Sequence, residues 1–172
     1  NELVQRIKNG GKLPMFTSCC PAWIRFAEDK FPELLDNIST CKSPMQMLAA
    51  TIKAMYKGEK KHVHVAIMPC SAKKDEARRE KFNGDVDYVL STQEVVRMIK
   101  EHGIHFKYLQ ETQPDNPFEE HTGASIIFGA SGGVMEAALR TAVETITGKT
   151  IDNIEYKEVR GMQGVKDAEY QV

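Results

Sequence analysis

The sequence predicts an α/β fold in which helices flank a mostly parallel sheet. Short apolar runs that are typical of strands alternate along the chain with segments of helical periodicity. Three helical segments also begin with start signals, at Pro21, at Ser43-Pro44 and at the capping box Ser91-Thr92-Gln93-Glu94. With 172 residues, the chain is long enough to bury a core.

The first elements are expected to run helix, strand, helix, helix. Residues 2–9 have a helical pattern, and residues 13–17 form a short apolar run that fits a strand. Pro21 at a first helical position predicts a helix over residues 21–30. The longer helix that begins at Ser43-Pro44 has an apolar stripe at i, i+3 and i+4 spacing, which we expect to face the core. The stripe consists of Met45, Leu48, Ile52 and Met55.

Strands and helices alternate in the middle of the chain. Residues 63–68 fit a strand that ends at Pro69-Cys70, and residues 72–80 fit a charged helix. Residues 86–90 fit a second strand. The capping box that follows them opens a helix that ends near residue 101.

The last third begins with a loop, because residues 110–123 contain two prolines and many acids. After the apolar residues 124–128, a helix is expected from Gly132-Gly133 to Thr147, and a strand over residues 154–159. The first residue is Asn, and a helical pattern begins at residue 2 without a cap. We therefore expect residues 1–172 to be part of a longer protein, truncated at both ends.

The composition excludes several classes of function. The net charge is −1 and the isoelectric point is about 6.6, so a basic surface for nucleic acid is not expected. No apolar run is long enough to span a bilayer and no signal peptide is recognisable, which favours the cytoplasm and leaves the periplasm open. Four cysteines are few for a disulfide scaffold, and they favour metal or redox chemistry instead.

Two adjacent cysteines, Cys19 and Cys20, carry most of the chemical information. They stand where the expected strand meets the helix at Pro21, and exposed N–H groups at a helix start favour thiolates. Adjacent side chains leave the backbone in different directions, so we expect one sulfur to bind a metal cluster and the other to be chemically active. Cys70 also follows an expected strand, at the kind of strand end where ligand sites lie in parallel α/β sheets.

Lys73 and Glu76 lie one and two helical turns beyond Cys70. A lysine three residues from a thiolate can stabilise it or bind an anionic ligand beside it. Instead of a ligand site, Cys70 could be a buried structural cysteine. Lys73 and Glu76 could likewise belong to a solvated helix face without a role in binding.

The segment Thr17-Ser18-Cys19-Cys20-Pro21-x-Trp23 resembles the first signature of the [FeFe]-hydrogenase catalytic domain. Met68-Pro69-Cys70-x-x-Lys73-x-x-Glu76 resembles its second signature. Ser39-x-x-x-Ser43-Pro44 and the run from Phe128 to Ala138 are similar to other parts of the same domain. The resemblance extends from end to end of the chain and implies one lobe of the iron hydrogenase catalytic domain.

By this resemblance the cofactor is an H-cluster, which is a [4Fe–4S] cluster bridged by cysteine to a di-iron subcluster with CO, cyanide and azadithiolate. Cys20 and Cys70 are then two ligands of the [4Fe–4S] cluster. Lys73 holds a cyanide by a charge-assisted hydrogen bond, and Met68 and Pro69 wall the pocket.

The resemblance also implies a proton route. Cys19 is the proton donor that faces the amine of the dithiolate, and Glu2 and Ser39 lie on the route to it. Glu76 is a structural partner near the cluster. The implied reaction is the reversible reduction of protons to H2, with electrons from ferredoxin or another carrier.

Three departures from the family pattern matter. The third signature, with two more cysteines, does not occur in residues 1–172, and neither does a further glutamate of the proton route. Met45 stands where many relatives have a glutamine. With half of the cluster ligands present, the isolated chain is expected to be inactive, and whether it binds the cluster stays open. We also expect the chain to self-associate through the surface that the missing remainder of the domain would cover.

Other assignments remain open at this stage. The four cysteines at positions 19, 20, 41 and 70 could form a zinc site, although Cys-x-x-Cys spacings are absent. We expect Cys41 to be a small buried residue. His62 and His64 share one face of an expected strand, which fits a polar outer face better than a metal site. The glycines of Gly129-Ala130-Ser131-Gly132-Gly133 fit close backbone approach better than a phosphate cradle.

Two relatives of the same fold class give alternative functions. Cytosolic iron–sulfur assembly proteins bind clusters without turning over hydrogen, and sensory hydrogenases regulate. Both tend to lack the first thiol of the Cys-Cys pair, so the presence of Cys19 favours catalysis.

Overall fold

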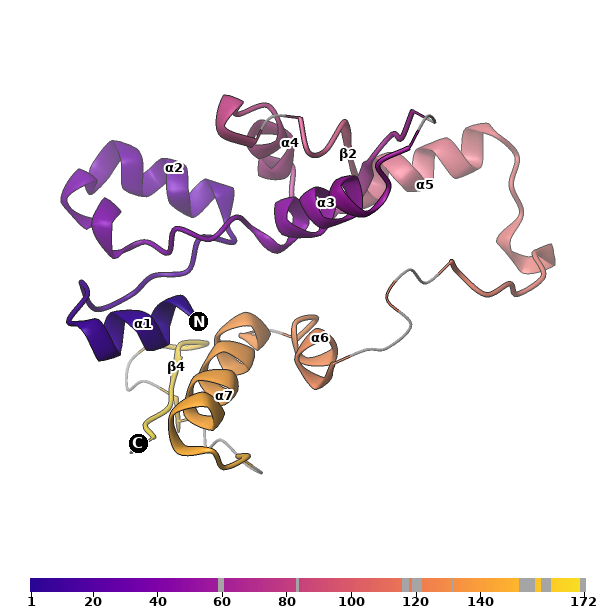
Figure 1. The fold of residues 1–172 in the computed structure, drawn as a ribbon. Coiled ribbons are helices and arrows are strands. Elements are labelled where there is room, and N and C mark those ends of the chain that lie inside the picture. Colours follow the sequence, from indigo (N-terminus) through magenta and orange to yellow (C-terminus); the bar gives the residue numbers. More distant parts are fainter. Residues whose placement is uncertain are drawn as a thin grey trace. The chain divides into compact units, whose positions relative to one another are not determined.

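The computed structural model describes residues 1–58, 61–82, 84–115, 118, 122–130, 132–151, 157–158 and 162–170 (Figure 1). The chain forms two compact units. The central unit is Pro14–Gln113, and the terminal unit combines Asn1–Leu13 with Pro114–Val172.

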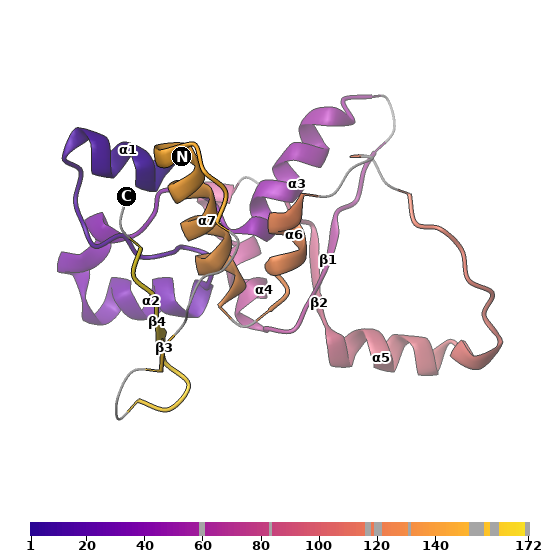
Figure 2. The ribbon, with the colours of Figure 1, turned by 90° about the horizontal axis from the view of Figure 1, so that it is seen from below.

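The central unit contains a pair of parallel strands, which confirms the parallel sheet that the sequence predicts. β1 (Val65–Met68) pairs with β2 (Tyr88–Ser91) in a register that runs from Val65 opposite Tyr88 to Met68 opposite Ser91. Figure 2 shows the two strands side by side. The crossover between them contains the helix α4 (Ala72–Ala77) and the 3-10 turn η2 (Glu80–Phe82). The carboxyl end of β1 therefore leads directly into the second cysteine motif.

The core of the central unit lies between the strands and the helix α3 (Pro44–Met55). Ala49, Val86 and Val89 are buried together, and Met45 and Met68 pack against them. The expected apolar stripe of α3 is wrong in part, because Leu48 and Met55 are 50% and 49% exposed. A sheet of two strands is narrow, so it covers only the side of α3 that carries Met45 and the small Ala49. Gln46, which the stripe omits, is fully buried.

Two helices have the starts that the sequence predicts. α2 (Pro21–Lys30) has Pro at its first position, and it is followed by a 3-10 helix, η1 (Pro32–Asn37). α5 (Thr92–Glu101) begins with the predicted capping box, in which Ser91 and Glu94 exchange hydrogen bonds, and a short 3-10 turn, η3 (Phe106–Tyr108), follows it. Hydrogen bonds from Lys74 and Ser91 lower the pKa of Glu94 to about 2.

The strand expected over residues 13–17 is wrong. Only an isolated parallel bridge between Phe16 and Ile38 is present there. Pro14 has no N–H to donate, and it interrupts any ladder at this point. The other boundaries differ less: β1 and β2 each begin two residues later than expected, and the helix expected over residues 72–80 becomes a 3-10 turn after Ala77.

The terminal unit contains the helices α1 (Glu2–Asn9), α6 (Gly123–Ile127) and α7 (Gly133–Thr147). Both α1 and α6 contact α7, whose start and end are as the sequence predicts. β3 (Lys157–Glu158) pairs antiparallel with β4 (Lys166–Asp167). The strand expected over residues 154–159 coincides with β3 at 157–158, and its other residues lie outside the described part. In the described residues, no helix is long and apolar enough to cross a membrane.

Gly133 confirms the expected close backbone approach at the start of α7. A Cβ atom on Gly133 would lie 1.8 Å from the carbonyl oxygen of Ile127 in α6, a backbone atom that cannot move without shifting that helix. Gly129, four residues earlier, would meet its nearest atom at an ordinary 3.9 Å.

We predict that Gly133→Ala lowers the free energy of unfolding by about 3 kcal/mol, because the added methyl overlaps fixed backbone. Urea unfolding followed by circular dichroism measures the change. Gly129→Ala is the matched control and should cost less than about 1 kcal/mol. Equal losses in both variants would show that α6 does not pack on α7 at this distance.

Candidate functional site

Cys20 occupies the cap position of α2, as the sequence predicts. Its backbone is extended, with φ −99° and ψ 110°, and its Sγ accepts the backbone N–H of Trp23 at 3.4 Å. Cys20 is exposed, whereas Cys19 is half-buried with its Sγ 3.9 Å from the hydroxyl of Thr17. The Sγ of Cys20 therefore lies beside the N–H groups that open α2.

Cys70 lies in the turn between β1 and α4, which confirms the predicted position at a strand end. It is a half-buried free cysteine. Met68 closes β1 and packs against the core, and Pro69 is exposed between the two. Since the core fixes Met68, the position of the Cys70 backbone follows from the sheet.

Lys73 and Glu76 form a buried ion pair, so a solvated helix face is wrong for both residues. Their side chains are 8% and 4% exposed, and Lys73 Nζ lies 2.9 Å from Glu76 Oε2. The same ammonium donates to the backbone carbonyl of Cys19 at 2.7 Å. This hydrogen bond joins the first cysteine motif to the second.

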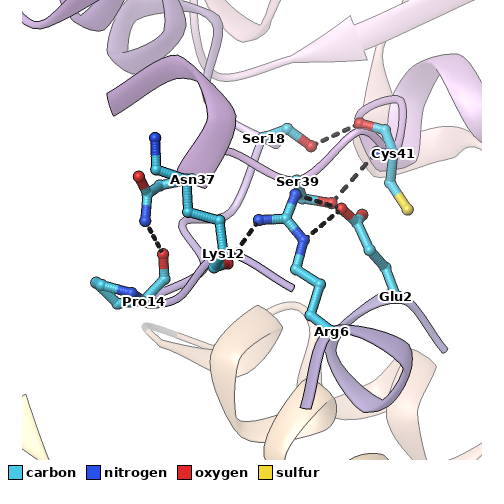
Figure 3. A network of polar contacts seen from close by, with 8 residues as sticks. All are labelled: Glu2, Arg6, Lys12, Pro14, Ser18, Asn37, Ser39 and Cys41. Carbon is cyan, nitrogen blue, oxygen red and sulfur yellow. Dashed lines mark hydrogen bonds and ion pairs between the residues drawn. The ribbon is translucent and has the colours of Figure 1, made fainter. Parts of the chain in front are cut away.

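Ser39 is held beside the first motif by the bridge between Phe16 and the segment after η1. Phe16 donates its N–H to the carbonyl of Asn37, and Ser39 donates its N–H to the carbonyl of Phe16, both at 2.8 Å. Ser18 donates its hydroxyl to the carbonyl of Cys41 at 2.6 Å, and Ser39 Oγ accepts the N–H of Cys41 at 3.2 Å (Figure 3). Cys41 is exposed, so the expected burial is wrong; it lies in irregular chain before α3.

Ion pairs link α2 to the segment that follows Cys70. Arg25 on α2 pairs with Asp75 on α4 at 3.1 Å, and this hydrogen bond lowers the pKa of Asp75. Arg79, just beyond α4, pairs with Glu28 on α2. The Arg25–Asp75 pair is exposed and contributes little by itself, whereas the Arg79–Glu28 pair is partly buried; both connect the two cysteine-bearing elements.

A pocket of about 400 Å³ includes Glu76 in its lining. The lining combines hydroxyl groups, the carboxylate of Glu76 and apolar side chains. Its polar lining includes Ser18, Ser39, Thr40, Ser43 and Glu76. No local pattern in the sequence predicts this pocket, since its lining comes from several separate segments.

Glu2 lies in the first turn of α1, in the terminal unit, where it pairs with Arg6. Arg6 Nη2 lies 2.6 Å from Glu2 Oε1, and a second nitrogen of Arg6 donates to the carbonyl of Lys12 at 3.1 Å (Figure 3). Our sequence analysis missed Arg6, although its spacing of four residues from Glu2 was a usable signal.

The expected strand position of His62 and His64 is wrong, because β1 begins at Val65. His62 is exposed and stacks near Tyr56, whereas His64 is half-buried with its Nδ1 2.8 Å from the carbonyl of Asp85. In the part of the chain that the structure describes, no three His, Cys, Asp or Glu side chains gather closely enough to hold a metal ion. The four cysteines thus do not lie together as one four-thiolate group in this structure.

A family model described as "Iron only hydrogenase large subunit, C-terminal domain" matches residues 1–172. The chain is 46% identical to Iron hydrogenase 1 of Clostridium pasteurianum, over 99% of this chain and 31% of that protein. It is 46% identical to the periplasmic [Fe] hydrogenase large subunit of Nitratidesulfovibrio vulgaris, over 98% of this chain and 42% of that protein. The chain thus spans less than half the length of these relatives.

The structure is similar to that of an apo variant of the [FeFe]-hydrogenase HydA1 from Chlamydomonas reinhardtii. The TM-score is 0.80 at 42% sequence identity, over 96% of this chain and 44% of that one. A weaker similarity, at 34% identity over 92% of this chain and 37% of the relative, links the chain to a cytosolic iron–sulfur assembly component of Rattus norvegicus. The chain belongs to the iron-only hydrogenase large subunit family, whose members carry the H-cluster.

We predict that Cys20→Ala destabilises the metal-free chain by about 1 kcal/mol, because it removes the acceptor for the Trp23 N–H at the start of α2. Cys20→Ser should cost less, since a serine hydroxyl also caps a helix. Thermal unfolding of the three proteins provides the comparison. If the alanine variant is as stable as the serine variant, Cys20 does not cap α2.

Proposed function

We propose that this chain forms part of the catalytic domain of an [FeFe]-hydrogenase, which reversibly reduces protons to H2 at an H-cluster. The observation that carries the proposal is the hydrogen bond from Lys73 to the carbonyl of Cys19, because it brings both cysteine motifs of the family to one place in the central unit. Residues 1–172 would be one part of that domain.

The donor set fits part of an H-cluster. Cys20 and Cys70 are free thiols at two helix starts, and they would serve as two ligands of the [4Fe–4S] cluster. When bound, the cluster supplies electron transfer and the iron that carries the hydrogen chemistry. Lys73 has three N–H donors, of which two are engaged by Cys19 and Glu76, so a third is left for an anionic ligand such as cyanide. Met68 and Pro69 would form the wall of the cofactor pocket.

Proton transfer is proposed to use Cys19, with Ser39 and Glu2 farther along the route. Cys19 is half-buried, as a donor to an enclosed cofactor must be, and its thiol can both give up and take back a proton. Ser39 is fixed beside the first motif by main-chain hydrogen bonds, so its hydroxyl has a defined position.

The whole protein would require partners. The remainder of the catalytic domain would complete the ligands of the cluster, and ferredoxin or another carrier would supply electrons. H2 and protons are the proposed substrates. The cytoplasm is the proposed compartment, with the periplasm as the alternative, and exposed apolar side chains such as those of Ile67 and Tyr88 favour self-association of the chain when it is alone.

A second candidate function is iron–sulfur assembly without catalysis, which the weaker similarity to an assembly component supports. Both functions need Cys20 and Cys70. They differ in whether the protein uses the thiol of Cys19, which a cluster scaffold does not require.

We predict that, in the full-length protein that contains this segment, Cys19→Ser retains iron but loses at least about 100-fold in hydrogen evolution, because a hydroxyl is a far weaker acid than a thiol. Cys20→Ser and Cys70→Ser should lose iron. Iron analysis, optical spectra and hydrogen evolution with a chemical reductant give the two readouts separately.

Cys41→Ser is the matched control and should change neither readout. Full turnover in the Cys19→Ser protein would favour the assembly function. Loss of iron in that variant would contradict the separate roles of the two adjacent sulfurs.

A further inference from the structure

Lys73 has a contact that binding of a cofactor does not explain. Its ammonium lies 2.7 Å from the backbone carbonyl of Cys19, in addition to its ion pair with Glu76. We propose that Lys73 is a positioning residue for the thiol of Cys19, which it locks in place through this carbonyl before any metal binds. The importance of this contact for proton transfer rests on the proposed function. The positioning of Cys19 by Lys73 does not.

The hydrogen bond from Lys73 Nζ to the carbonyl of Cys19 belongs to a strong class of hydrogen bonds. An ionised donor makes a shorter and stronger hydrogen bond than a neutral one, and here the donor side chain is only 8% exposed. Glu76 holds the ammonium from the other side at 2.9 Å, so Lys73 cannot swing into solvent without leaving a buried carboxylate unpaired. The position of Nζ is thus set by α4.

Holding the carbonyl of Cys19 restricts the backbone that carries both thiols. This carbonyl belongs to the planar peptide that joins Cys19 to Cys20, so holding it restricts rotation about the bonds on either side. Cys20 is already held as the cap of α2 through Trp23. Among the described residues, the thiol of Cys19 has a single long contact, 3.9 Å, to the hydroxyl of Thr17, so its place depends mainly on the backbone.

The contacts of Lys73 also connect Cys19, the proposed proton donor, to Cys70, a proposed cluster ligand. Lys73 donates its own backbone N–H to the carbonyl of Cys70 at 3.3 Å. The backbone of Lys73 is therefore tied to Cys70 and its side chain to Cys19. A shift of one motif moves the other, which keeps the donor at a constant place relative to the metal site.

Hydrogen exchange measured by mass spectrometry on the metal-free 172-residue chain tests the lock without a cofactor. We expect Lys73→Met to raise exchange at the amides of Trp23 and Ile24, which donate to the Sγ and to the carbonyl of Cys20, by about tenfold or more. The capping box of α5 at Ser91–Glu94 should keep its protection and serves as the internal reference.

Lys73→Met leaves Glu76 buried and unpaired, so the double variant Lys73→Met/Glu76→Leu separates the two effects. The double variant should fold with normal protection of α5 and still show fast exchange at Trp23 and Ile24. Glu76→Gln keeps an acceptor beside Lys73 and should leave exchange at these two amides close to that of the unsubstituted chain.

Normal protection of Trp23 and Ile24 in the double variant would overturn the proposal. Exchange in Glu76→Gln as fast as in the double variant would also overturn it, because it would assign the effect to the ion pair alone. Neither outcome depends on iron, so this experiment tests the positioning role of Lys73 independently of the hydrogenase proposal. The hydrogenase proposal is tested by the iron content of the Cys20→Ser and Cys70→Ser proteins.

Discussion

The arrangement of the candidate site depends on one buried ammonium group, that of Lys73. A charge removed from water is costly unless it is paired and hydrogen-bonded, and here Glu76 and the carbonyl of Cys19 meet that requirement. The pairing is possible only when α4 lies against the segment before α2. The ion pairs between α2 and the α4 region support the same packing, although the exposed one is weak in water.

Local signals in the sequence predicted the elements that local physics determines. Proline and cap residues set the starts of α2, α3 and α5. The parallel pairing of the two strands follows from the alternation of strands with helices along the chain. The segment at 13–17 and the buried face of α3 could not be predicted in the same way, because tertiary packing decides them. Gln46 is buried and Leu48 is half-exposed, since the narrow sheet covers only one side of α3.

In the candidate site too, some features are set by neighbouring residues and others by tertiary packing. The cysteines at helix starts and the strand end before Cys70 were predictable, because each is a property of a few neighbouring residues. The bond from Lys73 to Cys19 joins residues 54 positions apart, and no local spacing indicates it. The burial of Lys73 and the exposure of Cys41 likewise depend on how separate segments meet. In this account the protein prepares the positions of its thiols, and a cluster completes the site.

The most direct test of this account asks whether Cys20 and Cys70 lie close together without metal. The measurement uses the chain with Cys19→Ser and Cys41→Ser, which leaves two thiols, and dibromobimane, a short reagent that fluoresces strongly after joining two thiols. The account predicts an intramolecular bridge between Cys20 and Cys70, confirmed by peptide mass spectrometry, and its loss when Lys73→Met/Glu76→Leu is added. Separate labelling of the two thiols without a bridge in the parent chain would contradict the claim that the fold assembles the cysteines before a cluster binds.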